Sequence, residues 1–191
     1  VNGNPATIFM QNSKGRAAHV FSLIYPCPCG DCLGHGGFSG PEIARQATFT
    51  GMAFGFDAEA LRSAKRWFEL TNSGPDARAV VAQLSLRTGD KRAAKRHFKK
   101  LLDDSDEPPG EKLLLLARFL GDEEDTDAVD KLVRSLARPY RDSAAAHRAV
   151  ATTALRNGDY EHAGMRARKA MELDPSDIGL RLLYARILMS E

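Results

Sequence analysis

The densest group of reactive side chains in this sequence is a cysteine cluster near its beginning. The group spans nine residues and consists of Cys27, Cys29, Cys32 and His35. Thiolate and imidazole are ligands that suit zinc, so this spacing is a candidate metal site. The spacing is cramped, because common structural zinc sites take two separated pairs of ligands. Three alternatives compete: reduced cysteines in a disordered lead-in, a disulfide plus one free thiol, or a corrupted start to the sequence.

No catalytic constellation accompanies the cysteine cluster. Ser39 lies among glycines, but the segment before it is not a buried strand, so a nucleophile elbow is not formed. A phosphate-binding glycine loop and an H-E-x-x-H motif are both missing from the sequence. His147 and His162 occur singly on predicted helices. We therefore expect a protein that is not an enzyme and needs no cofactor, with zinc at the cysteines as the one candidate.

Composition excludes several partner classes. The 191 residues include 27 basic and 25 acidic side chains, so no net charge points to nucleic acid or a membrane surface. No run approaches the ~18 consecutive apolar residues of a membrane helix, and no signal-peptide pattern is visible. The chain begins with Val and stops inside a helical pattern. We expect it to be a piece of a longer protein, so its location cannot be derived from the missing signal.

The strongest organising feature of the chain is an internal repeat. Four alanines recur at spacings of 34, 34 and 35 residues, and three glycines and one glutamate stand five positions before them. A period in the thirties predicts a solenoid, because each unit is too small to bury its own apolar face. Such proteins mostly bind other proteins. The alanines are Ala60, Ala94, Ala128 and Ala163, preceded by Gly55, Gly89, Glu123 and Gly158.

The unit over residues 144–177 shows what one repeat predicts. Its first segment, 144–157, is rich in alanine and is followed by Gly158, which suits the left-handed position that ends a helix. Asp159 can then cap a second helix over 160–173. The unit therefore predicts two antiparallel helices joined by a tight turn.

This unit also resembles a known family. The string NGDYEHA at 157–163, followed by AMELDP at 170–175, resembles the tetratricopeptide repeat. The resemblance implies an all-α fold, a right-handed superhelical solenoid of antiparallel helix pairs, after an irregular or poorly ordered segment at 1–40. It also implies a protein or peptide partner, held in a concave groove lined by the first helix of each pair. The expected repeats are 41–74, 75–108, 109–143, 144–177 and a partial one at 178–191.

The partial repeat consists of one helix only. We expect Tyr184, Ala185 and Leu188 on its buried side. An array cut after one helix exposes an apolar face that a neighbour would cover, so we expect the isolated chain to self-associate.

Two further segments carry a narrower resemblance. PEIARQA at 41–47 and LLLLARFL at 113–120 are similar to proteobacterial tetratricopeptide lipoproteins of the outer membrane. Some members of that family tether a carboxy-terminal processing protease and present cell-wall hydrolases to it. The resemblance implies an adaptor in the cell envelope, tethered to the outer membrane from the periplasm, with a cytoplasmic location as the alternative. This chain shows no lipid-attachment cysteine signature.

The first helices supply the candidate partner groove. An apolar ridge flanked by arginines suits an extended or helical peptide with acidic residues. The alternative is that five apolar members, one in each unit, are core residues packed between repeats; they are Met52, Leu86, Leu120, Leu155 and Met189. The candidates are Arg45, Phe49, Met52, Gln83, Leu86, Arg87, Leu120, Arg148, Thr152, Leu155, Arg156, Arg186 and Met189.

One predicted helix carries a dense basic cluster. Basic clusters can contact phosphate backbones, but the only aromatic residue here, Phe98, falls on the apolar face. We therefore favour a solvated convex face without nucleic acid, and keep an RNA or anionic-surface site as an alternative. A second alternative function is a cysteine and histidine metal-binding or redox module carried on a helical-repeat arm. The basic residues are Lys91, Arg92, Lys95, Arg96, Lys99 and Lys100.

Overall fold

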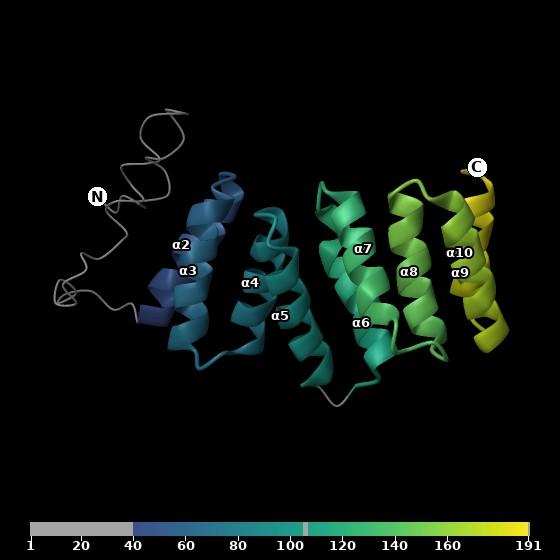
Figure 1. The fold of residues 1–191 in the computed structure, drawn as a ribbon, viewed down its shortest axis with the longest axis horizontal. Coiled ribbons are helices and arrows are strands. Elements are labelled where there is room, and N and C mark those ends of the chain that lie inside the picture. Colours follow the sequence, from purple (N-terminus) through teal and green to yellow (C-terminus); the bar gives the residue numbers. More distant parts are fainter. Residues whose placement is uncertain (1–39, 105–106, 191) are drawn as a thin grey trace, which may run out of the picture. The chain divides into compact units, whose positions relative to one another are not determined.

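The computed structural model describes residues 40–104 and 107–190, and within these ranges the chain forms helices and no strand (Figure 1). The all-α prediction is thereby confirmed. The predicted irregular segment, apart from Gly40, and the cysteine cluster lie outside the described residues. The chain divides into two compact units, Val1–Thr71 and Asn72–Glu191. None of the described helices is both long and apolar enough to cross a membrane.

The first unit contains one helix pair. Helix α2 (Gly40–Ala53) and helix α3 (Asp57–Leu70) pack against each other across a short turn that includes Gly55, at a φ of 72°. Thr48 and Ala60 are fully buried. The Thr48 hydroxyl donates a hydrogen bond to the Ala44 carbonyl at 2.7 Å, which satisfies this buried polar group. Trp67 is also buried.

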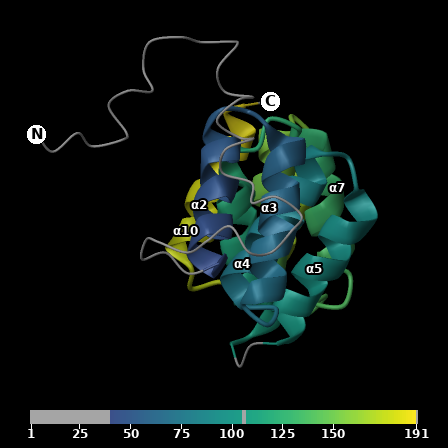
Figure 2. The same cartoon turned by 90° about the vertical axis from the view of Figure 1, so that its left-hand side faces the viewer.

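The second unit holds the remaining helices. Three pairs follow one another, α4 with α5, α6 with α7 and α8 with α9, and α10 comes last among the described helices, without a pair. Figures 1 and 2 show α4 and α5 lying side by side. Beyond these pairs, α8 packs against both α6 and α7, and α10 packs against α9. The elements are α4 (Pro75–Arg87), α5 (Lys91–Asp103), α6 (Pro109–Phe119), η2 (Leu120–Asp122, a 3-10 helix), α7 (Thr126–Ala137), α8 (Ala144–Arg156), α9 (Tyr160–Leu173) and α10 (Ile178–Leu188).

Two of the turns in this unit follow the pattern that the sequence predicts. Gly89 and Gly158 adopt left-handed φ values of 84° and 76° between the helices of their pairs. An aspartate then caps each following helix: Asp90 accepts from the Ala93 amide at 2.9 Å, and Asp159 from the His162 amide at 3.2 Å. Left-handed glycine and an aspartate cap together fix where one helix ends and the next begins.

The turn of the third repeat is built differently. The chain passes through η2, and Glu123 follows with a φ of −72° and a ψ of 134°. This is extended backbone, which any residue adopts, so the position does not require glycine. Asp125 still caps α7, accepting from the Ala128 amide at 2.8 Å.

The apolar core of the second unit extends across repeats. One cluster joins side chains from α4 to α8, including Phe98 and Leu113, which are almost fully buried. A second cluster joins α8, α9 and α10, with Ala163 fully buried within it. A small side chain at such a contact permits a short interaxial distance. Within the second unit, each repeat is therefore covered by its neighbour.

The buried face of α10 differs from our expectation. Leu180 and Ile187 are buried, whereas Ala185 is exposed and Leu188 is 52% exposed. Tyr184 is half-buried, as part of the face that contacts α9. Residues spaced by three, four and seven positions share a helix face, and this places 180, 184 and 187 together. The expected position of Ala185 and Leu188 was wrong because that face was set one residue too far along.

Candidate partner-binding surface

Two polar residues expected in the groove contact the next repeat. Arg87 donates from Nε and Nη2 to the Glu123 carboxylate at 2.8 and 2.9 Å, and Gln83 donates to the same carboxylate at 2.6 Å. Glu123 is 6% exposed, so the contact is largely withdrawn from water. Glu123 therefore links the third repeat to α4, using the position where the other repeats have glycine.

Two further groove arginines also contact residues outside their own helix. Arg148 on α8 pairs with Asp177 at 2.8 Å, and Asp177 caps α10 by accepting from the Gly179 amide. Arg156 donates to the Leu120 carbonyl at 3.1 Å. The Arg148 guanidinium thus connects α8 to the start of α10, and that of Arg156 connects α8 to the preceding repeat. Only part of each side chain faces solvent.

The apolar groove candidates divide between core and surface. Leu86 is 6% exposed and Leu120 is fully buried, so both lie in the core. Met52 and Leu155 are half-buried. Met189, just after α10, is 82% exposed.

The remaining candidates lie on the surface or close to it. Thr152 is half-buried and donates to the Arg148 carbonyl at 2.9 Å, while Arg186 is exposed on α10. In the first unit, the Arg45 guanidinium lies 5.3 Å from the Phe49 ring centroid and 5.9 Å from that of Trp67. Such cation–π contacts hold the exposed arginine over the apolar face.

The structure places an apolar surface on α6 that our sequence interpretation missed. Leu115 and Phe119, one helical turn apart, are 53% and 45% exposed. They border a cavity of about 210 Å³ between α4, α5 and α6. The Lys112 ammonium at the cavity donates to the Leu102 carbonyl at 2.8 Å, so its charge is turned to the backbone. The remaining lining residues are apolar: Ala79, Phe98, Leu101, Leu102 and Leu116.

A signal for this surface was present in the sequence. Residues 113–116 are four consecutive leucines, and successive helix positions point about 100° apart, so they cannot all face one core. Leu113 and Leu114 are buried, and Leu115 is the one that faces outward. The family resemblance instead predicted Leu120 as the groove residue of this repeat.

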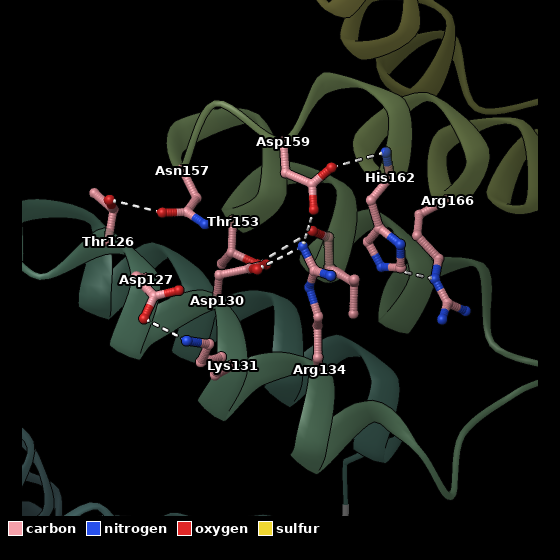
Figure 3. A network of polar contacts seen from close by, with 11 residues as sticks. Thr126, Asp127, Asp130, Lys131, Arg134, Thr153, Asn157, Asp159, His162 and Arg166 are labelled. Atoms are coloured by element: carbon pink, nitrogen blue, oxygen red, sulfur yellow. Dashed lines mark hydrogen bonds and ion pairs between the residues drawn. The ribbon is translucent and has the colours of Figure 1, made fainter.

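A polar network fixes α7, α8 and α9 relative to one another (Figure 3). Arg134 pairs with Asp130 at 2.6 Å and with Asp159 at 2.7 Å. Thr153 donates to the other Asp130 oxygen at 3.1 Å. The hydrogen bond from Arg134 holds the pKa of Asp159 below its usual range. One buried donor, Arg134 Nε, has no acceptor among the described residues.

His162 lies at the edge of this network. Burial lowers its pKa from 6.5, and the positive charges of Arg134 and Arg166 lower it further. Its Nε2 accepts a hydrogen bond from Arg166 Nε at 3.3 Å (Figure 3), which requires the neutral ring. This histidine is therefore uncharged at neutral pH.

Within residues 40–104 and 107–190, no three histidine, cysteine or acidic side chains come close enough to hold a metal ion. The candidate zinc ligands Cys27, Cys29, Cys32 and His35 lie outside these ranges. The basic residues of α5 are all exposed, and Phe98 is buried beneath them. That helix therefore presents charge without an aromatic surface on which bases could stack.

Several solved structures are similar to this chain in fold. MamA from Desulfovibrio magneticus RS-1 has 16% identity and a TM-score of 0.43, over 80% of this chain and 85% of that chain. The C-terminal part of a TPR repeat-containing protein from Cytophaga hutchinsonii has 12% identity and a TM-score of 0.44, over 91% and 66%. A thermophilic TPR protein of Thermus thermophilus has 16% identity and a TM-score of 0.35, over 78% and 99%. No protein-family model and no curated protein matches the sequence.

Proposed function

We propose that this chain is a non-enzymatic scaffold that binds a protein or peptide partner, and that α6 carries part of its binding surface. The observation that supports this is the exposed pair Leu115 and Phe119 beside an apolar cavity. An apolar side chain of a partner buried there would remove its own surface and that of Leu115 and Phe119 from water. This burial stabilises the complex by roughly 25 cal/mol per Å² of apolar area. An apolar pocket bordered by an aromatic residue is a typical anchor site in protein interfaces.

The neighbouring charge suggests the chemistry of the partner. Arg118 lies between Leu115 and Phe119 in sequence and is exposed. A guanidinium group binds carboxylates through paired hydrogen bonds. The proposed partner is therefore a peptide segment that inserts a leucine or aromatic side chain and places an acidic residue nearby. At the end of α10, Arg186 and the following Met189 repeat the combination of exposed arginine and exposed apolar side chain, and we propose them as a second contact.

A peptide-display selection tests this proposal. Peptides are selected on the wild-type chain and their affinities are measured by fluorescence anisotropy against L115S/F119S and against K95S/K99S, an exposed double variant on α5. We expect the selected peptides to share an apolar residue near an acidic one, and to lose about tenfold or more in affinity for L115S/F119S alone. Equal affinity for wild type and L115S/F119S would contradict the proposed site.

A more specific role than that of a scaffold, as an envelope adaptor for a carboxy-terminal processing protease, is supported by the sequence resemblance alone. It predicts that the full protein co-purifies with such a protease. The alternative of a metal module depends on the cysteine cluster, and it predicts stoichiometric zinc in the purified chain that is lost in Cys29→Ser. No zinc in either form would remove this alternative.

A further inference from the structure

A second cavity lies where α7, α8 and α9 meet. Its volume is about 400 Å³, within the range of small-ligand pockets. The lining comes from the end of α7, the loop that leads to α8, the first half of α8, and Arg166 and Lys169 of α9. The polar lining residues are Arg134, Arg138, Arg141, Arg166, Lys169 and Tyr140, together with His147; no acidic residue lines the cavity.

The charges around this cavity are only partly compensated. Arg134 is held by Asp130 and Asp159, and Lys169 pairs with Glu172 at 2.9 Å. Arg166 donates a hydrogen bond to the neutral ring of His162 and forms no ion pair with the described residues. Arg138 and Arg141 make no ion pair within the described part of the chain. The cavity therefore has an excess of positive charge contributed by separate elements.

The loop that carries two of these arginines is anchored. His147, which is 7% exposed at the start of α8, forms a hydrogen bond from Nε2 to the Arg141 carbonyl at 2.9 Å. A carbonyl oxygen only accepts, so the hydrogen lies on Nε2. The Tyr140 amide also donates to the Ala137 carbonyl at 2.9 Å. The loop backbone is thus positioned before any ligand binds, which reduces the entropy lost on binding.

We propose that this cavity binds a phosphate group. A phosphate carries about −1.5 to −2 charges at neutral pH and offers three acceptor oxygens, which several forked guanidinium groups can contact together. The cavity is larger than a phosphate ion needs, so it has room for the compound or peptide to which the phosphate is attached. The site does not depend on the α6 surface, and neither Leu115 nor Phe119 lines it.

Isothermal titration calorimetry with inorganic pyrophosphate tests this site. The variant R138Q/R141Q removes the charges of two exposed side chains that make no ion pair with the described residues, so we expect it to leave the fold intact. The matched control K95Q/K99Q removes the same charge from α5. We expect one equivalent of pyrophosphate to bind wild type and the control alike, and at least about tenfold weaker binding to R138Q/R141Q. Absence of binding to wild type, or equal weakening in both variants, would overturn the proposal.

A second titration identifies the source of the phosphate. A phosphoserine peptide and its unphosphorylated form are compared with pyrophosphate on the same three proteins. Tighter binding of the phosphopeptide, with the same loss in R138Q/R141Q, supports a phosphorylated partner. Tighter binding of pyrophosphate with that loss supports a free phosphorylated compound. Equal affinity for the phosphorylated and unphosphorylated peptides, together with no pyrophosphate binding, contradicts a phosphate site.

Discussion

Glu123 shows how a single residue couples two repeats. It occupies the position of Gly55, Gly89 and Gly158, yet its backbone has no left-handed φ, so the side chain is available for another purpose. That purpose is the contact with Gln83 and Arg87 of the preceding repeat. The departure from the repeat pattern thus coincides with a contact between repeats.

We predict that Glu123→Ala destabilises the second unit by about 3 kcal/mol. The change leaves Arg87 and Gln83 without their shared acceptor, and breaking a buried pair costs about 3–5 kcal/mol, with the low end expected here because Arg87 is partly exposed. The free energy of unfolding in urea measures the effect. Lys131→Ala, which removes a fully exposed pair with Asp127, serves as control and should leave the midpoint unchanged.

We predict that Gly158→Ala costs about 1–2 kcal/mol in unfolding free energy. The loss comes from the left-handed backbone alone, because an added Cβ at Gly158 meets no atom within 4 Å. Gly121 has equally open surroundings and no positive φ, so Gly121→Ala should be neutral or slightly stabilising. Equal costs at both positions in thermal unfolding would show that the turn conformation is not responsible.

At the scale of the helices, the network around Arg134 connects three elements through groups that titrate. His162 is held neutral by burial, so the unfolded chain takes up a proton near pH 6.5 while the folded chain does not. Stability must therefore fall as the pH drops below about 6.5, until the lowered folded pKa is reached. The Asp159 contribution is present above its ordinary pKa of 3.8 and is lost only as the pH falls through its lowered value.

We predict that the urea midpoint of the wild-type chain decreases as the pH is lowered below about 6.5. In His162→Asn this decrease should shrink, because the group that binds the proton in the unfolded state is gone. The comparison of the two pH profiles isolates His162 from the other histidines. A parallel decrease in both proteins would assign the acid sensitivity to another group.

How far the sequence predicts these elements depends on how local each signal is. Gly89, Gly158, Asp90 and Asp159 place turns and caps correctly, because a left-handed glycine and an aspartate cap act within a few residues. The partners of the groove arginines lie up to 36 residues away in sequence, so spacing within one helix does not reveal them. Leu115 was missed for a different reason, since a run of leucines does not show which of them faces outward.

At the scale of the whole chain, the described residues present two cavities of opposite character in the second unit. The apolar one borders α4, α5 and α6, and the basic one borders α7, α8 and α9. The two core clusters and the contacts between repeats stabilise the helices that line both cavities. A repeat architecture can therefore present separate binding surfaces on helices that pack against one another.

The central claim is that the partner binds at α6. Methyl NMR of the leucine-labelled chain, titrated with a display-selected peptide, tests it most directly. We predict that the resonances of Leu115, Leu116 and Leu101 shift first and furthest, because these side chains line the apolar cavity. Shifts confined to Leu182 and Leu188 on α10, with the α6 methyl groups unchanged, would contradict the account.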